Sequence, residues 1–109
     1  DDVPLSMEQA IPCGLIVNEL ISNALKYAFP KSVTKSKKIE VKIKAQENGI
    51  VELIVRDNGV GLPKEFDIHK TDSLGLKLVA TLAENQLDGE LKLNRRYGTK
   101  FTIRFKIST

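Results

Sequence analysis

The sequence has little of what several common kinds of functional site require. It contains one cysteine, Cys13, one histidine, His69, and no tryptophan among 109 residues. A single cysteine excludes a disulfide within the chain and a cysteine-rich zinc site, and it is typical of a reducing compartment. No apolar run approaches the roughly 20 residues that a membrane-spanning helix needs. Thiol-based metal centres and membrane spans are therefore not expected.

The composition is that of a globular protein. Apolar residues make up 41% and charged residues 28%, which excludes disordered and fibrous classes. The length predicts a single domain, residues 1–109, with a modest two-layer core. The net charge of +3 comes largely from lysines between positions 31 and 44, which we interpret as a solvated loop and strand face. The start, Asp1-Asp2, has no signal-peptide pattern and indicates a fragment of a longer protein.

Two segments have the apolar spacing of helices. Ser6 and Gln9 have the form of a capping box, which predicts a short helical turn. A longer helix is predicted from Pro12 to Tyr27, because proline suits a first turn. The second helix is predicted to follow a cap at Thr71 or Asp72. The predicted apolar faces are Ile16, Leu20 and Ala24, widened by Leu15 and Leu25, in the first helix, and Leu74, Leu78, Val79 and Leu82 in the second.

Four further segments have one apolar and one mostly polar face, as half-buried strands do. A two-residue hairpin turn is predicted at Asn48-Gly49, and another turn at Tyr97-Gly98. Because each strand has one apolar face, we expect an antiparallel or mixed sheet covered by helices on one side, an α/β two-layer sandwich. The predicted strands are Ile39–Ala45, Ile50–Asp57, 90–94 and 99–107.

The most informative segment is Asp57-Asn58-Gly59-Val60-Gly61-Leu62-Pro63. Asp57 falls on the same strand face as Val51, Leu53 and Val55. A carboxylate on the apolar side of a sheet is costly without a partner, and a ligand with a donor, such as the amino group of adenine, would supply one. The two glycines allow a positive φ and a close approach of a ligand to the backbone.

The first helix carries polar side chains along one side, at Glu19, Asn23, Lys26 and Tyr27. Amide and carboxylate oxygens suit Mg²⁺, and an ammonium group suits phosphate. The alternative is an ordinary polar edge of an amphipathic helix with local hydrogen bonds.

Two glycine segments follow. Ser73-Leu74-Gly75-Leu76-Lys77 opens the second helix, where unpaired N–H groups form an anion site. Gly98-Thr99-Lys100-Phe101 opens the last strand. Each alone fits an ordinary structural glycine, so the order of all the segments carries the argument.

That order resembles the ATP-binding domain of sensor histidine kinases, in the GHKL superfamily that also includes DNA gyrase B, MutL and a major chaperone. Asn23 falls in the N box, DNGVGLP in the G1 box, SLGLKLV in the G2 box and GTKF in the final glycine segment. The resemblance covers essentially the whole chain. It implies the Bergerat fold, a mixed, mostly antiparallel sheet with helices on one face.

The resemblance also implies ATP and Mg²⁺ as ligands and a role for each matching residue. Asp57 would receive the adenine amino group, and the base would be lined by Gly59, Gly61 and Leu62, with Thr99 as a further nucleotide contact. Asn23 and Glu19 would hold Mg²⁺, and Lys26 and Tyr27 would lie near the phosphates or ribose. The phosphates would meet the backbone of Leu74, Gly75 and Leu76, and the ATP lid would run from Pro63 to Ser73.

The chain departs from the pattern at Glu19, where many kinases have asparagine. In gyrase-type ATPases a glutamate here is the general base, so Glu19 is the candidate catalytic residue, with a role in metal binding or proton removal. The predicted lid is short and Ser73 replaces a usual glycine. The short lid, together with NELISNALKYAFP and SLGLKLV, is similar to kinases whose phosphoacceptor domain is of the second HisKA type.

A histidine kinase needs an acceptor histidine, and this chain has only His69, in the predicted lid. The resemblance therefore implies an acceptor on a separate upstream dimerisation domain, a response regulator as a further partner, a cytoplasmic location, and a monomeric fragment without membrane or nucleic-acid contact. Alternatives remain a GHKL ATPase using Glu19 as base and a serine kinase of the anti-sigma-factor type. A nucleic-acid-binding module using Lys35, Lys37 and Lys38 is the last alternative.

Overall fold

The computed structural model describes residues 3–28, 36–62 and 66–108. The predicted loop from Lys31 to Lys38 and the beginning of the predicted lid at Pro63 lie largely outside these ranges. Among the described residues, no helix is long and apolar enough to cross a membrane. The elements are α1 (Met7–Tyr27), β1 (Ile39–Ala45), η1 (Glu47–Gly49), β2 (Ile50–Asp57), α2 (Leu74–Thr81), η2 (Leu82–Gln86), β3 (Glu90–Asn94) and β4 (Thr99–Lys106).

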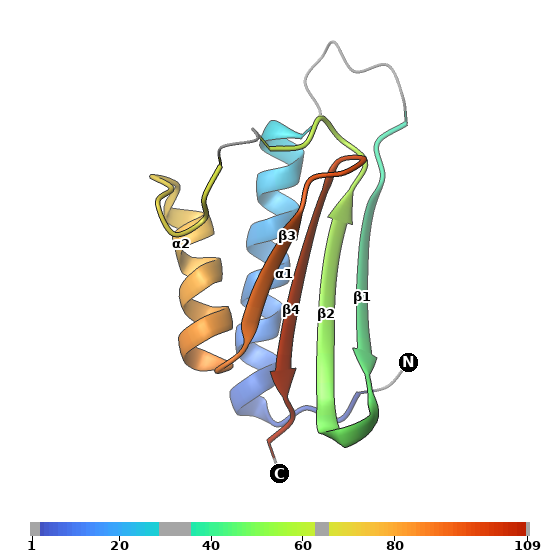
Figure 1. Cartoon of the computed structure of the whole chain (residues 1–109), viewed down its shortest axis with the longest axis vertical. Coiled ribbons are helices and arrows are strands. Elements are labelled where there is room, and N and C mark those ends of the chain that lie inside the picture. Colours follow the sequence, from blue (N-terminus) through green and yellow to red (C-terminus); the bar gives the residue numbers. More distant parts are fainter. Residues whose placement is uncertain (1–2, 29–35, 63–65, 109) are drawn as a thin grey trace.

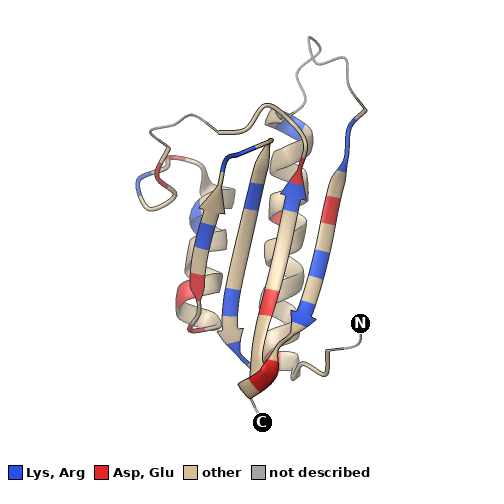
Figure 2. Ribbon diagram, turned by 45° about the vertical axis from the view of Figure 1, so that its right-hand side comes forward, with Lys and Arg blue, Asp and Glu red and all other residues tan. Residues whose placement is uncertain are grey.

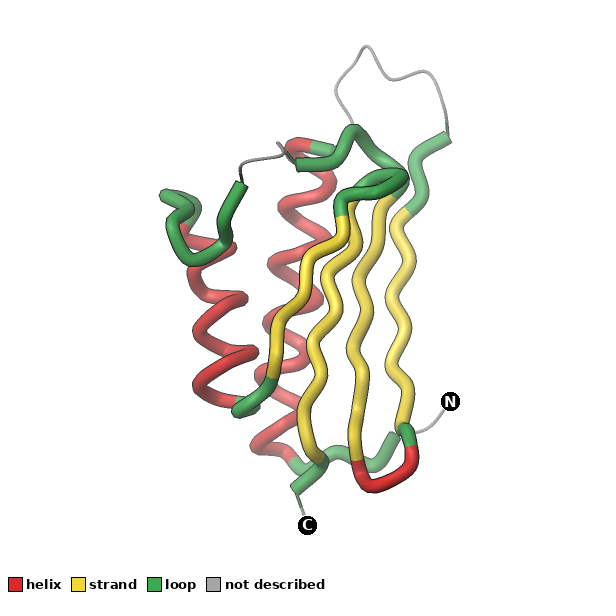
Figure 3. The backbone as a smooth tube through the Cα atoms, viewed as in Figure 1, coloured by secondary structure: helices red, strands yellow, loops and turns green. Residues whose placement is uncertain are grey.

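The four strands form one sheet in the order β1-β2-β4-β3, and every neighbouring pair is antiparallel. Both helices lie on the same face of this sheet, and the other face is left uncovered (Figures 1 and 3). The predicted two-layer sandwich is confirmed. A fully antiparallel sheet with one covered face explains the alternation of apolar and polar residues along most of each strand. Ile54 of β2 is an exception, because it lies on the other face and is buried as well.

The core lies between the sheet and the two helices. Ile16 of α1, Val79 of α2 and Ile103 of β4 are completely enclosed in it. The predicted face of α1 is confirmed at Ile16, Leu20 and Ala24, whereas Leu15 and Leu25 are exposed. The prediction that Leu15 and Leu25 widen the buried face of α1 was wrong, because these two leucines lie outside the side of the helix that covers the sheet.

The buried face of α2 also differs from the prediction. Leu74 is 82% exposed and Leu78 is exposed, although Val79 and Leu82 are buried as expected. The remaining buried positions from the start of α2 to η2 are Leu76, Ala80 and Ala83. These positions follow helical spacing, and small alanines suit this face because α2 packs against α1 and its continuation η2 packs against both α1 and β3. Sequence reasoning favoured the larger leucines and chose the wrong rotation.

The first helix is one continuous element and not a short turn followed by a second start. Ser6 is its N-cap, but its side chain makes no capping bond. Gln9 is buried, donates to the carbonyl of Lys106 at 2.8 Å and accepts from the amide of Ser108 at 2.9 Å. Gln9 therefore ties the start of α1 to the end of β4, in place of the predicted capping box. Pro12 lies inside the helix.

Two local turns also differ from expectation. The hairpin between β1 and β2 has positive φ at Asn48 and Gly49 as predicted, but it spans residues 46–49 with a 3₁₀ turn. The cap of α2 is Ser73, whose Oγ accepts from the amide of Leu76 at 3.2 Å. Thr71, one of the predicted caps, instead accepts from the amide of Ser73 at 3.1 Å.

Candidate functional site

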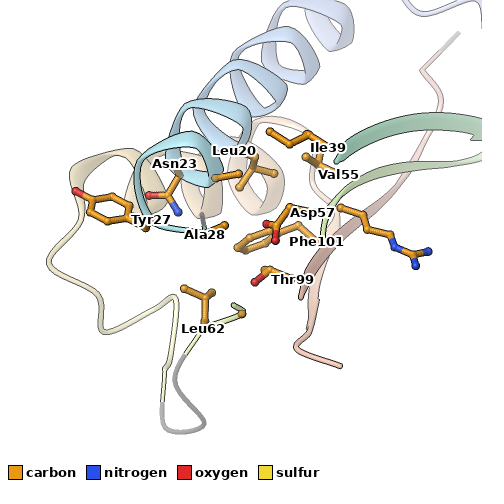
Figure 4. Close-up of a pocket in the computed structure, with 13 residues that line it drawn as sticks. Leu20, Asn23, Tyr27, Ala28, Ile39, Val55, Asp57, Leu62, Thr99 and Phe101 are labelled. Atoms are coloured by element: carbon orange, nitrogen blue, oxygen red, sulfur yellow. The ribbon is translucent and has the colours of Figure 1, made fainter. Parts of the chain in front are cut away.

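A cavity of about 170 Å³ lies between the C-terminal half of α1 and the adjoining ends of β2 and β4 (Figure 4). Its walls are mostly apolar, with a few polar side chains among them. Drug-sized ligand pockets usually span about 300–1,000 Å³, so this one suits a group the size of a nucleobase. The lining residues are Leu20, Asn23, Ala24, Tyr27, Ala28, Ile39, Val55, Arg56, Asp57, Gly61, Leu62, Thr99 and Phe101.

The sheet side of the cavity is built from two directly paired rows of β2 and β4. Asp57 is opposite Thr99, and Val55 is opposite Phe101. Asp57 is only 8% exposed, and its Oδ1 accepts the amide of Gly59 at 2.8 Å. Figure 4 shows the Asp57 carboxylate and the Thr99 hydroxyl beside the Phe101 ring. The apolar strand face thus ends in a polar pair directed at the cavity.

The loop after Asp57 is held against the end of α1. The amide of Val60 donates to the carbonyl of Ala28 at 2.9 Å. A Cβ at Gly59 would overlap that same carbonyl oxygen, so only glycine permits this approach. Asn58 connects the same loop to the segment before β1. Its Oδ1 accepts from the amide of Lys38 at 2.9 Å, and its Nδ2 donates to the carbonyl of Ser36 at 2.8 Å.

The turn between β3 and β4 closes onto the same loop. Gly98 has a φ of 105°, and a Cβ there would overlap the carbonyl oxygen of Asp57. Gly61, with a φ of 77°, faces the carbonyl oxygen of Gly98. The backbone beside the cavity therefore takes conformations that favour glycine at two positions from distant segments.

The structure brings half of the sequence-predicted site residues together around this cavity and leaves the rest elsewhere. Those that line it are Asn23, Tyr27, Asp57, Gly61, Leu62 and Thr99. Those that do not are Glu19, Lys26, Gly59, Leu74, Gly75 and Leu76. Gly59 lies directly behind the cavity wall, against Ala28. Lys26 is exposed.

The first turn of α2 forms a separate polar feature. Ser73 Oγ already bonds the amide of Leu76, and the Leu76 side chain is buried in the core. In the described part of the chain, the amides of Leu74 and Gly75 are the donors of this turn without an assigned acceptor. Glu19 of α1 reaches this turn, because a Cβ at Gly75 would meet its Oε2. Within the described ranges, no group of three histidine, cysteine or acidic side chains is arranged to hold a metal ion.

Sequence reasoning missed seven lining residues: Leu20, Ala24, Ala28, Ile39, Val55, Arg56 and Phe101. A signal for some of them was present. Val55 and Phe101 lie two residues from Asp57 and Thr99, on the same strand faces, and Leu20 and Ala24 share the buried stripe of α1. Such residues were counted only as core, although the core surface under a helix end also forms the wall of a pocket.

The chain matches the family described as histidine kinase-, DNA gyrase B- and HSP90-like ATPases over residues 8–109. It is 33% identical over 106 residues to the sensor histidine kinase PdtaS of Mycobacterium tuberculosis, a match covering 94% of this chain and 21% of that protein. The chain therefore spans about a fifth of the length of this curated relative.

Solved structures of two other proteins have the same fold as this chain. The histidine kinase domain of the blue-light-activated kinase EL346 from Erythrobacter litoralis superposes with a TM-score of 0.86 and 30% identity, covering 98% of this chain and 48% of the other. The ATP-binding domain of PrrB from Mycobacterium tuberculosis gives a TM-score of 0.69 and 26% identity, covering 91% and 69% of the two chains.

Proposed function

Because the chain belongs to the family of histidine kinase-, DNA gyrase B- and HSP90-like ATPases, we propose that it binds Mg-ATP and presents the γ-phosphate to a histidine on another domain. The chain would be one domain, residues 1–109, of a longer sensor kinase. The observation that carries this proposal is the buried Asp57 carboxylate beside an apolar, base-sized cavity under α1.

The base would lie in this cavity. Asp57 fits an adenine amino group, because a carboxylate in apolar surroundings needs hydrogen-bond donors to offset its lost hydration. The Thr99 hydroxyl, on the opposite strand, would donate to a ring nitrogen or to a bridging water. Leu62 and the backbone of Gly59 and Gly61 would cover the base from the loop side.

The phosphates would extend from the cavity along α1 toward the first turn of α2. The amides of Leu74 and Gly75 point to this role, since such donors and the helix dipole favour anions. Lys26 and Tyr27, both exposed near the end of α1, would lie near the phosphates or the ribose. The amide of Leu76 already donates to Ser73 Oγ, so the phosphates would meet the amides of Leu74 and Gly75, and Leu76 would only hold the turn in place.

The magnesium ion would be held by few protein ligands. Asn23 lines the cavity on the side of α1 and offers an amide oxygen, and Glu19 is one turn earlier on the helix. Two protein ligands would be enough for Mg²⁺, because it keeps several waters and takes phosphate oxygens. When bound, the ion neutralises phosphate charge, and this chain's residues supply orientation.

The transfer itself would need an upstream dimerisation domain that carries the acceptor histidine, with a response regulator receiving the phosphoryl group afterwards. We assign the acceptor to that domain and not to His69, the single histidine of this chain, whose ring is hydrogen-bonded to Glu84 of η2. We place the domain in the cytoplasmic part of the full protein and expect this fragment alone to be monomeric.

The experiment that tests nucleotide binding is calorimetric titration with a non-hydrolysable ATP analogue, with and without Mg²⁺. Asp57→Asn keeps the shape of the side chain but removes its charge, and we expect it to abolish measurable binding. Glu47→Gln is the matched control, because Glu47 is an exposed carboxylate in the hairpin turn away from the cavity. A folded wild-type chain that does not bind the analogue would contradict the proposal.

A second candidate, ATP hydrolysis with Glu19 as general base, is favoured by one contact. The Glu19 carboxylate lies against Gly75 in the turn where we place the phosphates. Steady phosphate release that Glu19→Gln suppresses, with analogue binding retained, would favour hydrolysis. No release above background from the wild type, with binding intact, would favour the kinase module.

A further inference from the structure

A second hollow lies at the same end of the molecule, around the end of β2 and the turn between β3 and β4. It has a volume of about 170 Å³ and is lined by Arg56, Asn94, Arg96, Tyr97, Thr99 and Lys100. The nucleotide cavity lies under α1 and shares only Arg56 and Thr99 with this hollow.

Its charge is unbalanced. Arg56 and Lys100 are directly opposite each other on β2 and β4, and each lies between two buried residues, so both face the uncovered side of the sheet. Like charges directly opposite each other destabilise a sheet. Arg56 is also opposite Glu40 of β1, but the Glu40 carboxylate forms its ion pair with Lys42, at 3.8 Å. Within the described residues, Arg56, Arg96 and Lys100 form no ion pair.

The opposite end of the same face provides the contrast. There the paired row is Lys44, Glu52, Arg104 and Glu90, in which cations and carboxylates alternate. Arg104 contacts Glu52 at 3.5 Å. Figure 2 shows basic bands at the tip of β2, the start of β4 and the adjoining turn; acidic bands also lie at the end of β2 and in the upper part of β1, but no acidic residue is among those that line the hollow. The surplus of positive charge is therefore local to the hollow.

The backbone beside the hollow is strained. Of the three described non-glycine residues with positive φ, two are Asn48 and Asp88, types that tolerate this conformation. The third is Tyr97, with a φ of 60° and a side chain 81% exposed. A bulky residue in the left-handed region is costly, and such strain concentrates at ligand sites. Tyr97 is one of the residues that line the hollow, and it is not part of the core cluster.

We propose that this hollow binds a dianionic phosphate group, either free in a small molecule or esterified on a protein segment. Two guanidinium groups and an ammonium come from three separate positions, and arginine binds phosphate oxygens in a bidentate manner. The Tyr97 hydroxyl and the Asn94 amide add donors at the rim. Bound phosphate would also remove the repulsion between Arg56 and Lys100.

The test is titration of the isotopically labelled chain with inorganic phosphate at constant ionic strength, followed by backbone amide NMR. We expect saturable shifts at residues 96–100 and at Arg56, with a dissociation constant on the order of 1–10 mM. Phosphate entering the nucleotide site would instead move the amides of Leu74 and Gly75, so the two sites are distinguished. Shifts that stay linear in concentration, or that occur only at α2, would overturn the proposal.

Two variants make the assignment specific. Arg96→Gln with Lys100→Gln should weaken binding about tenfold. The control, Lys44→Gln with Lys106→Gln, removes the same charge at the opposite end of the face and should leave the affinity unchanged. Equal losses in both pairs would mean general charge attraction and would contradict a site.

Tyr97→Gly separates a ligand role from a structural one. Glycine accepts the positive φ, so we expect a higher Tm together with weaker phosphate binding. A higher Tm with unchanged affinity for phosphate would show that Tyr97 does not take part in binding, and it would contradict the inclusion of Tyr97 in the proposed site.

A phosphoserine peptide and its unphosphorylated form distinguish the two possible sources of the phosphate group, a protein segment and a small molecule. Tighter binding of the phosphopeptide than of inorganic phosphate would assign a protein segment, and equal or weaker binding would assign a small molecule. No saturable binding of either probe would overturn the proposal.

Discussion

Asp57 and Thr99 are direct partners across β2 and β4, and both are buried on the strand face that α1 covers. Asp57 ends β2 and Thr99 begins β4, so the pair closes the apolar face with a carboxylate and a hydroxyl. The backbone on either side is held by close contacts, through Gly59 to Ala28 and through Gly98 to Asp57 itself. Two segments 42 positions apart in the chain thus form one small polar end to the core.

The first prediction concerns the hydroxyl of this pair. Thr99→Val keeps the branched shape and removes one hydrogen-bonding group. We expect nucleotide affinity to fall roughly threefold to tenfold, because one neutral hydrogen bond contributes about 0.5–1.5 kcal/mol. Stability should be unchanged or slightly higher. Calorimetric titration and thermal unfolding measure the two quantities, and unchanged affinity would remove Thr99 from the nucleotide contacts.

The second prediction concerns the packing of Gly59. In Gly59→Ala the added methyl group would overlap the carbonyl oxygen and Cβ of Ala28, so the loop must separate from the end of α1. We expect a loss of about 1–3 kcal/mol in the free energy of unfolding. Denaturant unfolding gives this value, and nucleotide binding should weaken in parallel because the cavity wall shifts.

Gly14 is the matched control for this substitution. It is an exposed glycine inside α1, and a Cβ there has nothing within 4 Å. Gly14→Ala should therefore stabilise the protein by roughly 0.5–1 kcal/mol through helix propensity. If both substitutions shifted stability in the same direction, the contact between Gly59 and Ala28 would not be the cause of the predicted loss.

Much of the fold could be predicted because each strand has one apolar face. The alternation in 99–107 and the shared face of Val51, Leu53, Val55 and Asp57 predicted which side chains are buried. These four are buried as expected, but Ile54 on the opposite face is buried as well. The rotation of α2 was not predictable in the same way. Its surface offers leucines on more than one side, and the choice depends on how closely α1 approaches the small Ala80 and Ala83.

The site was predictable where its residues are chemically distinctive and unpredictable where they are ordinary. Asn23, Asp57 and Thr99 stand in recognisable motifs and line the cavity, although their roles stay proposals. Val55, Phe101 and Ala28 are apolar residues like any others in the core, and only tertiary packing shows that a cavity adjoins them. The capping role given to Gln9 failed because its amide is used by a strand end 97 positions away.

The third prediction concerns Cys13, the only cysteine. It is buried in α1, and burial raises the pKa of its thiol to about 11, from an ordinary value of 9.0. At pH 8 this lowers the thiolate fraction about a hundredfold. We expect alkylation of the native protein to be at least that much slower than of the protein in denaturant, measured by mass spectrometry over time. Comparable rates would show that the start of α1 opens readily.

The last prediction concerns pH. His69 Nε2 lies 2.9 Å from Glu84 Oε2, and its Nδ1 lies 3.5 Å from Asp67 Oδ1. The hydrogen bond and charge of Glu84, and secondarily Asp67, raise the pKa of His69 above the ordinary 6.5. A raised pKa in the folded state means that the charged histidine stabilises the fold. This contribution is fully present below pH 6.5 and is lost as the pH rises through the higher folded-state value.

Because His69 is the only histidine, its ring signals report this titration without ambiguity. We expect an NMR midpoint above 6.5 in the wild type and a lower midpoint in Glu84→Gln, which keeps a hydrogen-bond acceptor but removes the charge. Asp72→Gln, at an exposed position on the same segment, should leave the midpoint nearly unchanged. Since Ile68 is buried beside His69, the segment should stay attached to the core after deprotonation, so only the contact with η2 is expected to loosen. A wild-type midpoint at or below 6.5 would mean that the ion pair with Glu84 is not formed in solution.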